Sequence, residues 1–115
     1  MTSQSHVCVA SLDPTKGSEQ AGKRPVSVIS RERINQLLPV VSVVPLTSRK
    51  SAARIVYPNE VFLPAGPAGL RVDSIALCYQ VGTLDKSRLE ADLGVLAEQE
   101  LQQKIREAIR FQLDL

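Results

Sequence analysis

Short apolar segments separated by clusters of proline, glycine and polar residues are the feature that most constrains the fold of this chain. Val7 and Val9 alternate with other residues, and residues 40–46 are dominated by β-branched side chains. Such segments, bounded by turn formers, are typical of β-strands. The pattern predicts strands at residues 6–11, 25–30, 40–46, 59–63 and 73–79, with residues 81–84 as a continuation or partner of the last.

One segment has a clear helical period. Leu101, Ile105, Ala108 and Ile109 form an apolar stripe at helical spacing, which predicts an amphipathic helix over residues 97–113. Residues 31–37 could form a short helix or a turn, and Pro39 would end this segment. Several strands with one terminal helix predict a mainly β domain over residues 1–115, in which a small curled antiparallel sheet packs against the helix.

Length and composition exclude several classes of protein. The chain has 115 residues, enough to bury a core without metal or disulfide staples, and its longest apolar stretch is far short of the ~20 residues of a membrane span. The polar start, Met1 to Ser5, gives no export signal, so we expect a cytoplasmic protein with reduced thiols. The sequence also lacks the glycine motifs of dinucleotide and P-loop nucleotide sites.

The residues with catalytic or metal-binding potential are few. Cys8, Cys78 and His6 cannot complete a closed zinc site alone, so we expect no metal and no cofactor. The two thiols are predicted to be small buried side chains. His6 is predicted to be a packed or exposed strand residue, since no partner is evident and no second histidine exists for an acid–base pair.

Charge is distributed unevenly along the chain. Residues 1–54 contain eight Lys or Arg against three acidic residues, whereas residues 55–115 contain six against nine. A basic half beside an acidic half favours a face for a polyanion. Charge alone leaves open the alternative that the basic residues belong to solvated loops.

Local motifs point to one family. The block of residues 11–30 contains Gly-Ser-Glu-Gln at 17–20 and Arg-Pro at 24–25, and residues 43–48 read Val-Val-Pro-Leu-Thr-Ser. With residues 60–64 and 73–89, these blocks resemble, in collinear order over nearly the whole chain, the MazF/PemK family of toxin endoribonucleases. The resemblance implies an SH3-like curled sheet or partial barrel, a homodimer and a cognate antitoxin as partner. It also implies metal-independent cleavage of single-stranded RNA at a short sequence, leaving a cyclic phosphate and a 5′-hydroxyl.

The same resemblance assigns candidate site residues. Arg24 and Thr47 match the family's catalytic arginine and threonine, and Arg24 would also protonate the leaving oxygen, with the general base unassigned. A planar guanidinium can hold the phosphoryl oxygens with two hydrogen bonds. Arg24 lies where the long polar loop enters the second predicted strand, and Thr47 just past the third, so pairing of these strands would bring them together. The predicted RNA contacts are Ser18, Glu19, Gln20, Lys23, Ser48, Arg49 and Gln80.

Other interpretations remain open for these residues. Arg24 could be an exposed loop arginine paired with Glu19, and Thr47 a turn hydroxyl. Residues 4–8 read Gln-Ser-His-Val-Cys where family members usually have Arg-Gly, an acid, Ile or Val, and an aromatic, and Gly82 stands where a basic residue is common. The alternative function is a weakened or inactive toxin-like module that captures an antitoxin or inhibits a protein target such as DNA gyrase.

Overall fold

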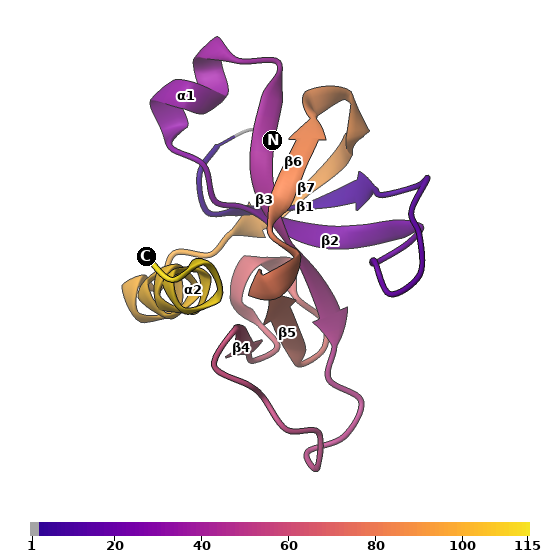
Figure 1. The fold of residues 1–115 in the computed structure, drawn as a ribbon, viewed down its shortest axis with the longest axis vertical. Helices are drawn as coiled ribbons and strands as arrows, with labels where there is room; N and C mark the ends of the chain where they lie inside the picture. Colours follow the sequence, from indigo (N-terminus) through magenta and orange to yellow (C-terminus); the bar gives the residue numbers. More distant parts are fainter. Residues whose placement is uncertain (1–2) are drawn as a thin grey trace.

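Seven antiparallel strands form one curved sheet within residues 3–115, the part of the chain that the computed structural model describes (Figure 1). Met1 and Thr2, the start of the polar N-terminal stretch, lie outside the described residues. The strands are β1 (His6–Ser11), β2 (Lys23–Val28), β3 (Val40–Ser48), β4 (Glu60–Leu63), β5 (Ser74–Leu77), β6 (Gly82–Asp85) and β7 (Leu89–Val95). The helices are α1 (Glu32–Leu37) and α2 (Gln99–Leu113), with 3-10 turns η1 (Pro67–Gly69), η2 (Cys78–Gln80) and η3 (Lys86–Arg88).

Strand β3 organises the sheet. The strand order is β4-β5-β3-β2-β1-β7, and β6 also pairs with β3. The first part of β3, up to Val43, pairs with β6, and from Leu46 onward it pairs with β5. Pro45 falls between these two ladders, where its missing N–H is tolerated most easily. The strand therefore changes partners midway, which lets the sheet curl.

Buried residues form two apolar clusters. The first lies under α2 and includes Val44, Leu46 and Leu63 with Ile105 and Ala108 of the helix. The second is enclosed by the curled strands and includes Cys8, Ala10, Val26, Val28, Val41, Val43 and Leu89. This arrangement confirms the predicted mainly β fold with a C-terminal helix. Within residues 3–115, no helix combines the length and the apolar character that crossing a membrane requires.

Several element boundaries differ from the prediction. Strand β7 was not predicted, although Leu89, Ala91, Leu93 and Val95 alternate as in a strand; most of its residues are exposed on the sheet edge, where it pairs only with β1. The predicted strand at 73–79 ends at Leu77, because η2 turns the chain from β5 into β6. The predicted third strand extends two residues further, through Ser48, where β5 gives it a partner.

Candidate active site

A pocket of about 630 Å³ opens between the β1–β2 loop (residues 12–22) and the strands β3 and β6. The loop contributes Ser18, Glu19 and Gln20, β3 contributes Val43 and Pro45, and Gln80 with residues 81–85 forms much of the remaining wall. We call this hollow the loop pocket. Four of the predicted RNA contacts thus share one pocket, although Gln80 lies 60 residues from Gln20 in the sequence.

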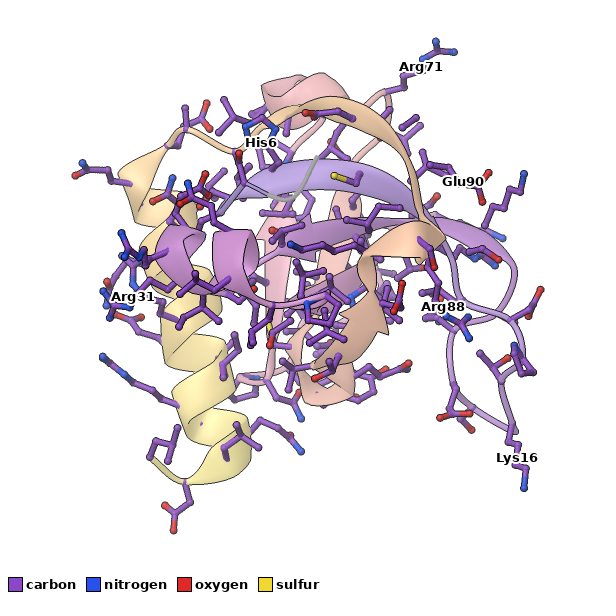
Figure 2. All side chains as sticks on the ribbon, turned by 90° about the horizontal axis from the view of Figure 1, so that it is seen from above. His6, Lys16, Arg31, Arg71, Arg88 and Glu90 are labelled. Atoms are coloured by element: carbon purple, nitrogen blue, oxygen red, sulfur yellow. The ribbon has the colours of Figure 1, made fainter. Side chains whose placement is uncertain are left out.

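Hydrogen bonds at the base of the β1–β2 loop join its two ends to each other and to Arg88 of η3. The backbone N–H of Leu12 donates to the Gly22 carbonyl oxygen (2.9 Å), and the Gly22 N–H donates to Asp13 Oδ1 (3.0 Å). Arg88 Nη1 donates to the carbonyl oxygens of Ser11 (3.2 Å) and Asp13. In Figure 2, Arg88 lies beside the base of the loop. Arg88 was not among the predicted site residues, and its only signal in the sequence is its position inside the matched block at 73–89.

Gln80 holds the middle of the loop over the pocket. Its Oε1 accepts from the backbone N–H of Gln20 (3.0 Å), and its Nε2 donates to the Ser18 carbonyl oxygen (3.3 Å). Both ends of the side-chain amide are therefore used by the loop backbone. The geometry makes Gln80 a positioning residue for the loop in addition to a predicted RNA contact.

Glu19 shapes the tip of the same loop. Its carboxylate accepts from the backbone N–H of Lys16, and its own N–H donates to the Lys16 carbonyl oxygen (3.1 Å). Lys16 points away from the sheet at the far end of the loop (Figure 2). The alternative in which Glu19 pairs with Arg24 is not formed within residues 3–115.

Arg24 is an exposed strand residue with its terminal nitrogens available. It lies on β2 opposite Ala10 of β1, since the strand begins at Lys23, two residues before the predicted start. Its Nε donates to the Ala21 carbonyl oxygen (3.2 Å), which is the one polar contact of its side chain with residues 3–115. The guanidinium can therefore present its outer edge to an anion without breaking an existing ion pair.

Thr47 lies in β3 rather than past its end. It is half-buried and pairs with Ile75 of β5. Side chains two residues apart in a strand share a face, so Thr47 projects on the same face of β3 as Val43 and Pro45, which line the loop pocket. Neither Thr47 nor Arg24 is itself among the residues that line the loop pocket.

The register of β2 and β3 relates Arg24 to Thr47. Val28 pairs with Val43 and Val26 with Pro45, and the ladder ends there. Continuing this register by two residues would set Arg24 across from Thr47. The strands separate before that point, because β3 turns to pair with β5. Both candidate catalytic residues therefore lie at the same diverging end of two neighbouring strands.

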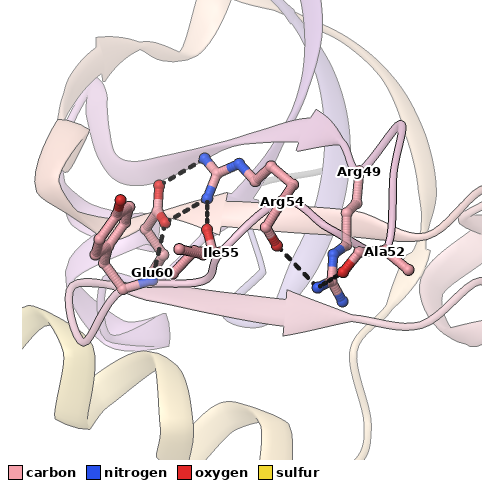
Figure 3. Close-up of polar contacts among 6 residues, drawn as sticks. Arg49, Ala52, Arg54, Ile55 and Glu60 are labelled. Carbon is pink, nitrogen blue, oxygen red and sulfur yellow. Dashed lines mark hydrogen bonds and ion pairs between the residues drawn. The ribbon is translucent and has the colours of Figure 1, made fainter.

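The other predicted RNA contacts lie outside the loop pocket. Lys23 forms an exposed ion pair with Glu90 of β7 (2.9 Å). Ser48 is exposed at the end of β3, opposite Ser74. Arg49 Nη2 donates to the carbonyl oxygens of Ala52 (3.0 Å) and Arg54 (2.9 Å), as Figure 3 shows.

Arg49 belongs to a group of contacts that shapes the β3–β4 loop (residues 49–59). Its guanidinium lies 5.0 Å from the Phe62 ring centroid. Beside it, Arg54 forms a bidentate ion pair with Glu60 (2.6 and 2.8 Å), and the Tyr57 N–H donates to the same carboxylate (3.1 Å; Figure 3). The Glu60 side chain is only 3% exposed. Hydrogen bonding from Arg54, followed by that from Tyr57, holds the pKa of Glu60 below its usual value although burial opposes this.

The cysteine predictions are confirmed, and His6 gains a partner. Both thiols are buried; desolvation raises the pKa of Cys78 to about 12 and, with the Asp92 carboxylate, raises that of Cys8. Such thiols stay protonated and make poor nucleophiles. His6 Nδ1 of β1 lies 2.7 Å from Asp92 Oδ2 of β7. The sequence did not predict this pair, because it did not predict β7. Within residues 3–115, no three His, Cys, Asp or Glu side chains gather to hold a metal ion.

Comparison with known proteins places these features in a family. Residues 3–113 match the model for the PemK-like, MazF-like toxin of type II toxin–antitoxin systems. The chain is 36% identical over 115 residues to endoribonuclease MazF of Staphylococcus saprophyticus, covering all of this chain and 93% of that one.

Solved structures share the fold. Crystalline MazF (form I) from Deinococcus radiodurans superimposes with a TM-score of 0.81 at 28% identity, covering 98% of this chain and 96% of that one. MazE–MazF (form II) from the same organism gives a TM-score of 0.71 at 25% identity, covering 98% and 95%. From its match to the family model and its identity to the staphylococcal relative, the chain belongs to the PemK-like, MazF-like toxins of type II toxin–antitoxin systems.

Proposed function

We propose that the chain is a sequence-specific endoribonuclease toxin that cleaves single-stranded RNA without a metal ion. A ribose 2′-OH attacks the adjacent phosphorus and the bond to the 5′-oxygen breaks, leaving a 2′,3′-cyclic phosphate and a 5′-hydroxyl. A cognate antitoxin neutralises it, and two copies form the active dimer. Support comes from the family, from a relative named as an endoribonuclease and from a neighbour solved as MazE–MazF.

The observation that carries the proposal is the state of Arg24. Its guanidinium is exposed, has one contact with a backbone carbonyl and lies at the diverging end of β2 and β3 that also holds Thr47. Charge develops on the phosphoryl oxygens in the transition state, and a fixed donor aimed at that charge is worth about 2.7–4 kcal/mol. A guanidinium already paired with a carboxylate would offer much less.

Each candidate residue then has a distinct role. Arg24 binds the phosphoryl oxygens and donates toward the departing 5′-oxygen, while the Thr47 hydroxyl fixes the phosphate from the opposite strand. Ser18, Glu19, Gln20 and Gln80 offer hydrogen-bonding groups to base edges in the loop pocket, the usual way that single-stranded RNA is read. Lys23 and Ser48 remain predicted contacts at the margin of this surface, whereas we assign Arg49 to the β3–β4 loop, whose carbonyl oxygens it binds.

The test uses a long single-stranded RNA in EDTA. Wild type should give discrete fragments whose 5′ ends accept phosphate from polynucleotide kinase directly, as a 5′-hydroxyl does, and whose 3′ ends carry a cyclic phosphate. Arg24→Ala should remove the fragments, and Thr47→Val, which keeps the shape and removes the hydroxyl, should reduce them strongly. Cutting by Arg24→Ala at the wild-type rate would reject the assignment.

One observation favours the second candidate, a weakened toxin that acts by binding protein. Cys8, at the position where relatives usually carry an aromatic, is fully buried in the curled sheet, and Gly82 lines the loop pocket without a side chain. Position 8 thus supplies no ring to the RNA surface. Failure of wild type to cut any RNA, with binding of a co-expressed antitoxin retained, would support this function instead.

A further inference from the structure

Three of the four aromatic residues gather on one surface beside the loop pocket. Tyr57, Tyr79 and Phe111 are 56%, 40% and 63% exposed, and all three line a second hollow of about 520 Å³. Tyr79 also lines the loop pocket. Tyr79 is therefore the one lining residue that the two hollows share.

The two tyrosines sit on well-fixed backbone. Tyr79 belongs to η2, between buried Cys78 and Gln80, whose amide holds the β1–β2 loop. Tyr57 exchanges backbone and side-chain hydrogen bonds with Glu60: its N–H donates to the carboxylate (3.1 Å), and its carbonyl oxygen accepts from the Glu60 N–H (2.9 Å). Little backbone freedom is lost when a ligand settles on these rings, which favours binding.

The kind of surface favours RNA over protein as its occupant. Unpaired bases stack on exposed aromatic faces, and this contact tolerates any sequence. The second hollow is lined by aromatic and polar residues together with Pro58, and it contains no aliphatic side chain. Ile55 is exposed by itself in the β3–β4 loop, whereas Ile34, Leu37 and Leu38 form a group of exposed aliphatic residues around α1, away from β4 and β5 (Figure 1). A protein partner that buries apolar surface has a better site there.

We infer that Tyr79 and Tyr57 form a stacking track that carries single-stranded RNA from the loop pocket into the second hollow. The inference rests on the proposed function and extends it to nucleotides beyond the cleavage site. Phe111 supplies an apolar wall at the far end of the track. The track compensates for the absence of an aromatic at position 8, because rings are offered by η2 and the β3–β4 loop instead.

Binding of non-cleavable RNA tests the track. The probe is a fluorescent 2′-O-methyl RNA of random sequence and about 15 nucleotides, long enough for both hollows. Tyr57→Leu and Tyr79→Leu should each weaken binding about tenfold, the loss of one base stack. Tyr57→Phe and Tyr79→Phe keep the ring and should stay within about twofold of wild type.

A length series separates stacking from a structural effect. A probe of about four nucleotides fills only the loop pocket, so Tyr79→Leu should weaken its binding and Tyr57→Leu should leave it unchanged. Equal losses for both probe lengths with Tyr57→Leu would overturn the track. Wild-type affinity of both leucine variants would also overturn it, and their reduced self-association in sedimentation velocity would then assign the rings to a contact between copies.

Cleavage distinguishes failure of the inference from failure of the proposed function. If wild type cuts long RNA while both leucine variants bind and cut like it, only the track is wrong. If wild type binds the probe through the tyrosines but never cuts, the track stands and the nuclease assignment fails. If wild type neither cuts nor binds RNA, both fail.

Discussion

The β1–β2 loop (residues 12–22) and the β3–β4 loop (residues 49–59) are both long and polar, each with basic residues in it or at its edge, yet the fold uses the arginines of the two regions differently. Arg24, just after the first loop, has one contact with a backbone carbonyl and is exposed. Arg49 and Arg54 in the second loop bind two carbonyl groups and a nearly buried carboxylate. The two regions hold similar numbers of basic residues, but of these three arginines only Arg24 is exposed and has a single polar contact within residues 3–115.

An arginine near a motif indicates a function only once its partners in the folded chain are known. An arginine satisfied inside the fold stabilises a loop, and removing it affects folding. An arginine left at a diverging sheet end costs little to remove, and its loss affects ligand binding. Each region can be tested by changing it and measuring both stability and RNA cleavage.

The largest expected effect separates the two regions most directly. Arg24→Ala should lower RNA cleavage by about a hundredfold or more, the loss of a preorganised donor to the phosphoryl oxygens. Its free energy of unfolding should change by less than about 0.5 kcal/mol, because the side chain is exposed. Arg24→Lys keeps the positive charge but loses the bidentate geometry of the guanidinium, so its cleavage rate should lie between those of wild type and Arg24→Ala. Urea unfolding measures the stability, and a cleavage time course measures the activity. A marked loss of stability in Arg24→Ala would contradict the assignment of Arg24 to ligand binding rather than to folding.

The second prediction concerns the buried carboxylate of the other loop. Glu60→Gln should lower the free energy of unfolding by about 2 kcal/mol, less than a fully buried pair would lose because Arg54 is 36% exposed. Cleavage by the folded protein should stay close to wild type. Glu90→Gln is the matched control, since the Lys23–Glu90 pair is exposed and should contribute less than about 1 kcal/mol. Equal losses in the two variants would mean that burial does not distinguish the regions.

Acid titration gives the third prediction. The pKa of Glu60 is lowered in the folded state, first by the hydrogen bonds from Arg54. Near this pKa the folded state therefore binds fewer protons at Glu60 than the unfolded state does. The resulting stabilisation is complete above the unfolded pKa of about 4.3 and is lost as pH falls through the lower folded value. Urea midpoints of wild type and Glu60→Gln should therefore converge below about pH 4 and separate above it. A constant difference across this range would contradict the role of the ionised carboxylate.

Most of the fold was predictable because local periodicity determines it. The alternation at Val7 and Val9 located β1 with its observed bounds, and the stripe through Ile105 and Ala108 located α2 within two residues. Strand β7 was missed because the segment has polar residues, an inner glycine and mostly exposed side chains. Within residues 3–115 it pairs with β1 alone, at sequence separations of 79 to 89 residues, and local sequence carries no such information.

The candidate site was predictable in composition but not in contacts. The family resemblance predicted Arg24, Thr47 and Gln80 as site residues. The hydrogen bond between Gln80 and the loop, however, joins residues 60 positions apart. Likewise, nothing in the sequence around Arg49 shows that its Nη2 donates to two carbonyl oxygens of the loop that it begins, while its buried Nε has no hydrogen-bond partner within residues 3–115. Long-range partners decide which polar side chains remain available, and these emerge only from the folded chain.

The fourth prediction tests the interpretation of Arg49. Arg49→Ala should lower the free energy of unfolding by about 1 kcal/mol, because the Ala52 and Arg54 carbonyl groups lose a shared donor and Phe62 loses its cation. Binding of RNA by the folded variant should remain near wild type. Anisotropy titration and urea unfolding together measure the two quantities. Weaker RNA binding at unchanged stability would show instead that Arg49 contacts RNA, as the sequence predicted.

The smallest expected effect is at the contact that holds the first loop in place. Gln80→Met keeps the length of the side chain and removes both hydrogen bonds to the loop, so stability should fall by only about 0.5 kcal/mol. Local opening should change more: the Gln20 amide loses its acceptor and should exchange with solvent faster. The Leu12 amide provides the internal control, because its bond to Gly22 at the loop base is untouched. Faster exchange at Leu12 as well would show that Gln80 stabilises the whole loop rather than its middle, and unchanged exchange at Gln20 would show that Gln80 does not hold the loop at all.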